Sequence, residues 1–262
     1  MKHIAKKRFG QNFLTDQSVI FSLIDAIAPQ PNDLMVEIGP GLGALTQPLM
    51  QKLKLLHLVE LDRDICAFMV KNYAKQYAEK SIIIHNVDAL KFDFTSLGDH
   101  LRVTGNLPYN ISTPILFHLL SNVVGIKDMH FMLQKEVVER MVAAPSTPAY
   151  GRLSVMLQYH LQMEYLITVP PESFEPAPKV ESAFVRCVPH ATLPFVAKNE
   201  ALFAKIVLAA FGQRRKTLRN TLKGLLDDAG FTAIGIDSKK RAENLSVADF
   251  VLISNHLCQS VV

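Results

Sequence analysis

The chain has 262 residues, of which 49% are hydrophobic, and its formal net charge is +4. This length suffices for one full domain with its own core and a smaller second domain. No uncharged apolar run approaches membrane-spanning length, so neither secretion nor membrane insertion is expected. Cys66, Cys187 and Cys258 are odd in number and widely spaced. This spacing favours reduced thiols and a cytoplasmic location over disulfides or a cysteine metal site.

Short β-rich runs alternate with helical patterns between residues 34 and 190, which predicts parallel strands joined by crossover helices. The last two strands are separated by a proline-rich segment that is too short for a crossover helix, so they are expected to pair antiparallel. The predicted strands are 34–39, 56–61, 81–87, 101–106, 127–134, 164–169 and 182–188. The sequence therefore predicts an α/β, Rossmann-like, seven-stranded and mostly parallel sheet.

A glycine-rich turn follows the first predicted strand, where Gly39 and Gly41 would let a ligand approach the backbone. Glu60 ends the second strand and is placed to accept hydrogen bonds from the two hydroxyls of a ribose, with Asp62 as the weaker candidate. The same glycines fit a dinucleotide fingerprint, so a nicotinamide dehydrogenase is a rival interpretation.

The end of the third strand helps to choose between these cofactors. The carboxylate of Asp88 can accept a hydrogen bond from the adenine amine of an adenosyl ligand. S-adenosylmethionine needs that contact and, unlike a dinucleotide, needs no pyrophosphate cradle. Alternatively, Asp88 caps the turn before Lys91.

The fourth strand leads into Asn106-Leu107-Pro108-Tyr109, which carries the groups needed to methylate an exocyclic amine of a base. The amine lone pair is delocalised into the ring until two acceptors hold the nitrogen in a near-tetrahedral geometry. The Asn106 side-chain oxygen and a carbonyl at Leu107 or Pro108 can accept its two N–H groups. Pro108 restricts the backbone before substrate arrives, and Tyr109 would stack on the base. The alternative is a strand end, a proline turn and a half-buried tyrosine.

Pro189 and Pro194 mark a boundary, beyond which helices are predicted over 199–211, 213–228 and 246–257. Residues 1–190 are thus expected to form the catalytic domain and residues 191–262 a small all-α domain. In the second helix, Arg215 and Arg219 are four residues apart and would share a face. The cluster that could contact phosphate, or simply form a solvated face, is Arg214, Arg215, Lys216, Arg219 and Lys223.

Five segments in a fixed order together resemble the small-subunit ribosomal RNA adenine dimethyltransferases of the KsgA/RsmA type. They are residues 6–14, 37–46, 106–112, 174–180 and 211–220. The resemblance extends from Lys6 to the C-terminal helices, and five motifs together are far more specific than one. It implies a Rossmann-like, S-adenosylmethionine-dependent enzyme that methylates N6 of two adjacent adenosines. These lie in a hairpin near the 3′ end of 16S ribosomal RNA, within the small ribosomal subunit or its precursor.

The resemblance also implies two sets of site residues. The cofactor-binding set is Asn12, Leu14, Gly39, Gly41, Glu60, Asp88 and Asn106. The target-base set is Asn106, Leu107, Pro108, Tyr109 and Phe174, with Phe174 stacking on the base face opposite Tyr109. No metal is expected, and His85, His118 and His130 are interpreted as core residues because they lie in or beside apolar segments.

Three other functions stay open on sequence alone: a DNA adenine methyltransferase, a large-subunit ribosomal RNA methyltransferase, and an assembly checkpoint factor for which methylation is secondary. Reaching an amine in structured RNA requires unstacking the base, and aromatic stacking can offset that cost. The protein is expected to act as a monomer.

Overall fold

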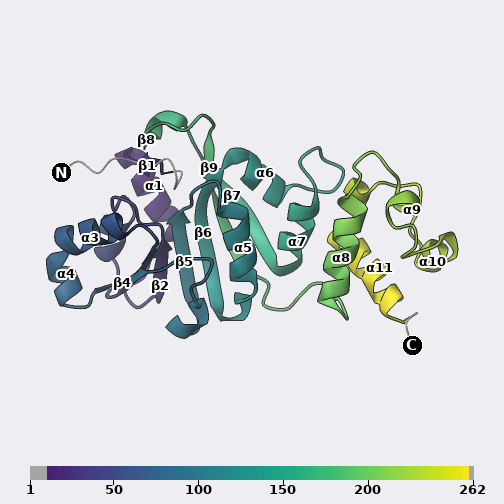
Figure 1. Ribbon diagram of the computed structural model, residues 1–262, viewed down its shortest axis with the longest axis horizontal. Coiled ribbons are helices and arrows are strands. Elements are labelled where there is room, and N and C mark those ends of the chain that lie inside the picture. Colours follow the sequence, from purple (N-terminus) through teal and green to yellow (C-terminus); the bar gives the residue numbers. More distant parts are fainter. Residues whose placement is uncertain (1–10, 260–262) are drawn as a thin grey trace. The chain divides into compact units, whose positions relative to one another are not determined.

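Seven strands form one sheet in the computed structural model, which describes residues 11–259 (Figure 1). Their bounds are β2 (Met35–Ile38), β3 (Leu56–Glu60), β4 (Ile82–Asn86), β5 (Leu101–Asn106), β6 (Ile126–Gln134), β7 (Leu161–Val169) and β9 (Ser182–Pro189). The predicted seven-stranded sheet is confirmed, with differences of a few residues at the strand ends.

The spatial order of the strands is β4-β3-β2-β5-β6-β9-β7. Neighbouring pairs from β4 to β6 are parallel, whereas β9 runs antiparallel to β6. β9 and β7 are neighbours, as the proline-rich segment between them suggested. The chain passes from β2 to β3 and β4 on one side and then returns to β5 and β6 on the other. Ligands of such sheets bind at this reversal, beyond the carboxyl ends of the strands.

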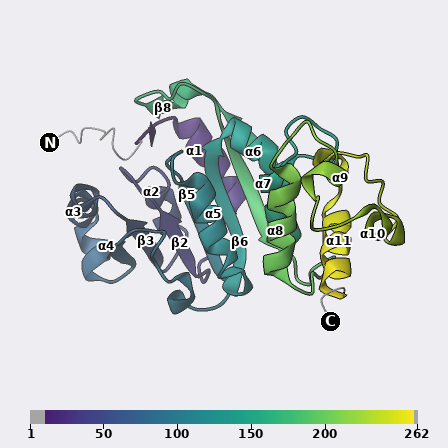
Figure 2. The same cartoon turned by 45° about the vertical axis from the view of Figure 1, so that its right-hand side comes forward.

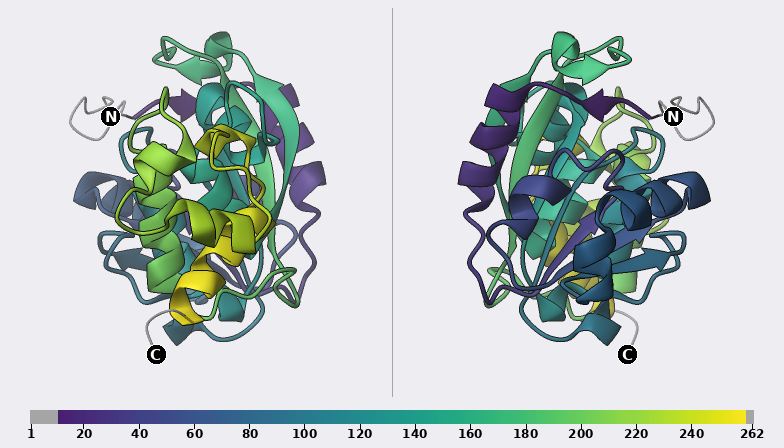
Figure 3. Two further views of the ribbon diagram at one scale, coloured as in Figure 1. Left: turned by 90° about the vertical axis from the view of Figure 1, so that its right-hand side faces the viewer. Right: turned by 90° about the vertical axis from the view of Figure 1, so that its left-hand side faces the viewer.

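Two further strands, β1 (Phe13–Leu14) and β8 (Phe174–Glu175), form a separate antiparallel pair (Figure 3). In this pair Leu14 lies opposite Phe174. Both strands were missed from the sequence because two residues carry no readable periodicity. The pairing joins the N-terminal segment to the proline-rich segment, although they are far apart in the chain.

The helix α1 (Gln17–Ile27) shows how the sheet is covered. Asp16 caps its first turn by accepting hydrogen bonds from the backbone N–H groups of Ser18 and Val19. The buried residues of the helix recur every three to four positions and so form one face. They belong to the core cluster that also includes strand residues of β2, β3, β6 and β9. The helix α5 (Ser112–Leu120) lies on the opposite face of the sheet (Figure 2). Three further helices of the first unit are α2 (Thr46–Met50), α3 (Arg63–Asn72) and α4 (Ala74–Ala78).

The chain divides into two compact units, Met1–Val138 with Glu164–Pro189 and Glu139–Met163 with His190–Val262. The second unit has its own core, in which Tyr159, Phe203 and Phe250 are buried. Its helices include α7 (Arg152–His160), α8 (Glu200–Phe211), α9 (Leu218–Thr221), α10 (Asp228–Ala233) and α11 (Val247–Gln259), while α6 (Lys135–Val142) spans the first division. The segment Glu139–Met163 was not expected to group with the C-terminal helices, since no change of composition marks it.

The single helix predicted over residues 213–228 is wrong. Thr217 is extended at the start of α9, and Gly224 has a φ of +84° after it, so the helix cannot continue. Asp227 then caps α10, a separate helix, by accepting from the Gly230 N–H. Arg215 lies before α9, and therefore Arg215 and Arg219 do not share a helical face. Leu218, Leu222 and Leu226 are buried, and Leu225 partly so, without the continuous helix that their spacing suggested.

Short 3-10 helices complete the described elements: Phe94–Leu97, Val123–Gly125, Pro171–Ser173 and Ala242–Asn244. Among residues 11–259, no helix has both the length and the apolar character needed to cross a bilayer.

Candidate active site

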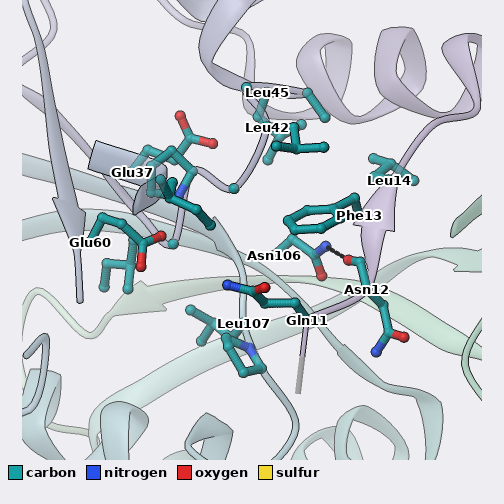
Figure 4. A pocket seen from close by; sticks show the side chains of 18 of the residues that line it. Gln11, Asn12, Phe13, Leu14, Glu37, Leu42, Leu45, Glu60, Asn106 and Leu107 are labelled. Atoms are coloured by element: carbon teal, nitrogen blue, oxygen red, sulfur yellow. Dashed lines mark hydrogen bonds between the residues drawn. The ribbon is translucent and has the colours of Figure 1, made fainter. Parts of the chain in front are cut away.

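A cavity of about 720 Å³ opens where the sheet order reverses. Its walls are the loops after β2, β3, β4 and β5, together with the β1 segment and Phe174. Because these four strands are parallel, their carboxyl ends meet at one edge of the sheet. Every predicted site residue lines this cavity: Asn12, Leu14, Gly39, Gly41, Glu60, Asp88, Asn106, Leu107, Pro108, Tyr109 and Phe174. Figure 4 shows several of these side chains around it.

The glycine turn forms one wall. Gly39 and Gly41 have φ angles of +66° and +54°, a left-handed conformation that favours glycine. A Cβ atom at Gly41 would lie 3.1 Å from the Phe13 ring, so the turn passes close under that ring. The Gly39 N–H donates to the Val59 carbonyl at 2.9 Å and anchors the turn to β3. Backbone rather than side chains therefore faces the cavity here.

Two carboxyl groups lie beside the turn. Glu60 accepts a hydrogen bond from the Asp62 N–H at 2.7 Å, and burial raises the pKa of its carboxyl. Glu37, in β2, is 1% exposed and accepts from the Thr46 hydroxyl at 2.7 Å. Burial raises the pKa of Glu37 to about 7, and the nearby Glu60 adds to this. Glu37 was missed as a site residue because an acid inside an apolar strand gives no distinct signal.

The weaker ribose candidate, Asp62, does not line the cavity. It caps α3 by accepting from the Asp64 N–H at 3.0 Å. Asp88 accepts from the Leu90 N–H at 3.0 Å through Oδ1, as expected for a turn cap, and it also lines the cavity. Its Oδ2 is the oxygen that can serve a ligand.

The composition of the lining bears on the cofactor. Among the described residues, the cavity is lined by Glu37, Glu60 and Asp88 but by no lysine, arginine or histidine. Such a wall suits a ligand with positive charge and hydroxyl groups. The residues therefore fit an adenosyl sulfonium.

Asn106 ends β5 and projects toward the N-terminal segment (Figure 4). Its Nδ2 donates to the Asn12 carbonyl at 3.1 Å. This bond fixes the orientation of the amide, so Oδ1 is the atom left to accept from a ligand. Of the two carbonyls considered as the second acceptor, that of Pro108 already accepts from the Ile111 N–H at 3.1 Å. The Leu107 carbonyl is therefore the better candidate.

The two aromatic residues differ in their surroundings. Tyr109 is half-buried, and its hydroxyl lies 2.8 Å from Oγ of Ser182. Burial raises the pKa of the Tyr109 phenol. Phe174 is 5% exposed and belongs to the core cluster, yet it also lines the cavity opposite Leu14 in the β1–β8 pair.

No cluster of three His, Cys, Asp or Glu residues within 11–259 is placed to hold a metal ion. The histidines lie outside the cavity lining. His85 pairs with His57 at 3.0 Å, and His118 lies 2.9 Å from the Phe92 carbonyl. Cys66, Cys187 and Cys258 are all free thiols.

A second group of cations, missed from the sequence, joins the predicted basic cluster in the second unit. The Leu218 N–H donates to the Lys240 carbonyl at 2.8 Å, and the Arg219 N–H donates to the Ser238 carbonyl at 3.0 Å. These bonds bring two exposed segments together. We call the exposed cations of these two segments the basic surface, namely Arg214, Arg215, Lys216, Arg219, Lys223, Lys239, Lys240 and Arg241. Two of them are paired with carboxylates, Arg219 with Asp228 at 2.8 Å and Arg241 with Glu243 at 3.8 Å.

A mostly parallel sheet with this strand order, a glycine turn after β2 and an acid at the end of β3 defines a Rossmann-like protein of the methyltransferase class. The family model described as "Ribosomal RNA adenine dimethylase" matches residues 2–259, and the chain belongs to that family. Ribosomal RNA small subunit methyltransferase A of Methylobacillus flagellatus is 70% identical over 257 residues, which cover 98% of this chain and 99% of that protein.

Two solved structures are similar along nearly the whole chain. The dimethyladenosine transferase from Plasmodium falciparum has a TM-score of 0.79 at 24% identity, covering 95% of this chain and 98% of its own. The 23S rRNA methyltransferase ErmE has a TM-score of 0.73 at 22% identity, covering 95% of this chain and 100% of its own. At these identities the likeness establishes the fold alone. Since the two proteins are named for different activities, the fold does not choose the substrate.

Proposed function

We propose that the chain is an S-adenosylmethionine-dependent ribosomal RNA adenine N6-dimethyltransferase. Its substrate is two adjacent adenosines near the 3′ end of 16S ribosomal RNA in the small ribosomal subunit. The name of the Methylobacillus relative, at 70% identity, supports the choice of small subunit. The observation that carries the chemistry is the Asn106 amide, held by Asn12 with its oxygen free at the end of β5.

The cofactor end of the cavity is assigned as follows. When bound, S-adenosylmethionine supplies a methyl carbon that is electrophilic because it is bonded to a cationic sulfur. Glu60 accepts from the ribose hydroxyls and Asp88 from the adenine amine, while the backbone at Gly39 and Gly41 lies against the ligand. Asn12 and Leu14 close the cavity from the N-terminal segment. The acidic lining supports this assignment.

At the other end, the Asn106 Oδ1 and the Leu107 carbonyl accept the two N–H groups of the target amine. This holds the nitrogen near-tetrahedral with its lone pair directed along the line of attack. Tyr109 and Phe174 stack on the two faces of the base, offsetting roughly a few kcal/mol of unstacking. As the methyl group passes from sulfur to nitrogen, the S–CH3 bond breaks, a neutral thioether is left and the positive charge moves to the nitrogen. The cationic nitrogen is acidic enough to lose its proton to water, so no side chain needs to act as a strong base. Positioning supplies most of the acceleration.

The second transfer places a demand on the same acceptors. After one methylation, N6 keeps a single hydrogen, so one acceptor must give way to a methyl group. Both acceptors are held by the fold, because Asn106 donates to the Asn12 carbonyl and the Leu107 N–H donates to the Met132 carbonyl of β6, each at 3.1 Å. The pocket must therefore leave room for a methyl group beside one of these acceptors.

In this proposal the first unit performs catalysis and the second binds RNA through the basic surface. A-form grooves hide base sequence, so recognition depends on loop shape and phosphate positions and weakens with salt. The monomeric state and the cytoplasmic location stay predictions of the sequence.

The test is methyl transfer by the Asn106→Ala variant. We expect transfer to fall by at least about a hundredfold because the target amine loses the acceptor that positions it. The unfolding curve should stay close to that of the parent protein, since Asn106 is half-buried at a strand end. Labelled S-adenosylmethionine, under-methylated small subunits and mass analysis of the RNA give the readout.

The matched variant is Asn106→Asp, which keeps an acceptor oxygen but loses the donor to Asn12. It should retain more activity than Asn106→Ala, and equal turnover by Asn106→Ala and the parent would refute the assignment. Large subunits and duplex DNA serve as rival substrates in the same assay. Methylation of either in preference to small subunits would contradict the proposed substrate. A catalytically inactive variant that still arrests maturation of the small subunit would instead support the role of an assembly checkpoint factor.

A further inference from the structure

Ser182 is a buried polar residue outside the cavity that reaches into the site through one contact. It is the first residue of β9, its side chain is 0% exposed, and it pairs with Gln134 of β6 in the sheet. Its Oγ lies 2.8 Å from the Tyr109 hydroxyl. Ser182 does not line the cavity, whereas Tyr109 does.

The same contact decides where the Tyr109 ring can lie. Tyr109 stands in a loop without regular structure, between the end of β5 and the start of α5. Its backbone carbonyl accepts a hydrogen bond from the Ser112 hydroxyl at 2.9 Å, which holds the backbone of the residue. The phenol oxygen at the other end of the side chain is within hydrogen-bond distance of Ser182, in the strand β9. With both ends held, the ring axis from Cβ to the hydroxyl oxygen is restrained to one direction.

A ring that stacks on a base must stay at one place in the cavity wall, and a phenylalanine at this position would have no hydrogen bond to hold its far end there. The hydroxyl is not needed for stacking itself, because every aromatic ring offers a π-face. Its place 2.8 Å from a buried serine therefore points to a role in holding the ring in position. A buried hydroxyl left without this partner would be costly, which keeps the two groups together.

We propose that Ser182 is a positioning residue, which holds the Tyr109 ring at the place in the cavity wall where the target base stacks. This inference rests on the proposed function, since it takes Tyr109 as a wall of the base pocket. Ser182 acts only through Tyr109 and makes no contact with either ligand. The base pocket is thereby anchored to β9 and not only to its own loop.

The experiment is a double-mutant cycle of Ser182→Ala and Tyr109→Phe, each of which removes the bond from one side. Each single variant should lower kcat/KM for under-methylated small subunits roughly threefold to tenfold, the range expected for one hydrogen bond. The double variant should be no worse than the poorer single variant, because both substitutions remove the same bond. Affinity for S-adenosylhomocysteine should not change, whereas general loosening of the fold would weaken it as well.

Ser254→Ala is the matched control. Its side chain is also 0% exposed, and within residues 11–259 its Oγ has no hydrogen-bond partner. It should leave kcat/KM unchanged. Reductions that multiply in the double variant, or a Ser182→Ala protein with parental kcat/KM, would overturn the proposal.

Tyr109→Ala separates this inference from the function on which it depends. If Tyr109→Ala is impaired while Ser182→Ala and Tyr109→Phe are not, the tyrosine contacts the base but Ser182 does not position it. If Tyr109→Ala keeps full activity, the base-stacking role of Tyr109 fails and the Ser182 inference fails with it.

Discussion

Glu37 is a carboxyl group in a wall of the cavity, and its surroundings disfavour charge. It is 1% exposed, and its hydrogen bond from Thr46 does not compensate for the loss of water. The pKa of about 7 means that this group is largely protonated in the folded protein below neutral pH, whereas in the unfolded chain it ionises near 4.5. A cation bound in the cavity would favour its charged form.

This gives a signed prediction for stability. Below the unfolded pKa both states are protonated, and as pH rises toward 7 only the unfolded state releases the proton. The Glu37 contribution to the free energy of unfolding is therefore present at pH 4.5 and lost by about pH 7, with a size of a few kcal/mol at most. Glu37→Gln should remove that slope. Urea unfolding of the parent protein and of Glu37→Gln between pH 5 and 8 gives the free energy of unfolding at each pH. The same change with pH in both proteins would contradict the assignment.

At the residue scale, much of the site could be predicted because its members follow strands. Glu60, Asp88 and Asn106 each stand at or just after a carboxyl end, and the parallel topology brings such positions to one edge. Glu37 and Ser182 could not be found in this way. Both are polar residues within buried strand patterns, and the hydrogen bond between Ser182 and Tyr109 joins positions that are far apart in the chain.

At the scale of elements, one arginine ties four parts of the first unit together. Arg102 of β5 is 6% exposed, and its Nε donates to Asp128 of β6 at 2.9 Å. Its two other nitrogens donate to Asp33, before β2, and to the Ile27 carbonyl at the end of α1, both at 2.6 Å. The buried carboxylate of Asp128, the partly buried carboxylate of Asp33 and a helix end thus share one guanidinium, which fixes how α1 meets the strands.

We expect Arg102→Met to destabilise the protein by about 3–5 kcal/mol, because Asp128 would stay buried without the guanidinium and the partly buried Asp33 would lose its strongest partner. Lys127→Met is the control. Lys127 pairs with the same Asp33 at 3.3 Å, but its side chain is 50% exposed, so its removal should cost less than about 1 kcal/mol. Urea unfolding gives the loss of stability in the two variants. Equal losses would show that burial does not set the strength of the ion pairs made by Arg102 and Lys127.

The elements were predictable where they were long and periodic. The seven sheet strands and helices α8 and α11 were found from sequence, whereas the two-residue strands β1 and β8 were not. The leucines in residues 213–228 repeat as in a helix, but Thr217 and Gly224 interrupt it. Hydrogen bonds from α9 to residues 238–240 then take the place of helical ones. Local periodicity alone cannot reveal such long-range partners.

At the scale of the whole molecule, the cavity and the basic surface belong to different compact units. In the proposed function one unit holds the cofactor and the target base, and the other binds the RNA backbone. Variants in the first unit should therefore impair methyl transfer itself, whereas variants in the second unit should weaken RNA binding. Both kinds of variant should reduce methylation.

We expect Arg215→Glu and Lys240→Glu each to weaken binding to small subunits. The slope of log affinity against log salt should fall by about one for each phosphate that the variant no longer neutralises. Binding of S-adenosylhomocysteine should not change. Lys205→Glu, which reverses an exposed charge on α8 outside the basic surface, is the control. Filter binding at several salt concentrations measures both effects, and an unchanged slope in the first two variants would remove the basic surface from the proposal.

The position of β9 has a consequence for biosynthesis. It is the last strand of the sheet to leave a ribosome, yet it occupies the gap between β6 and β7, which are made earlier. Until residue 189 has emerged, the edge of β6 that later pairs with β9 has no partner strand in the nascent chain. Such an unpaired edge can form hydrogen bonds with the wrong strand. Ser182 arrives with this strand, so Tyr109 meets its hydroxyl partner only when translation of the sheet is complete.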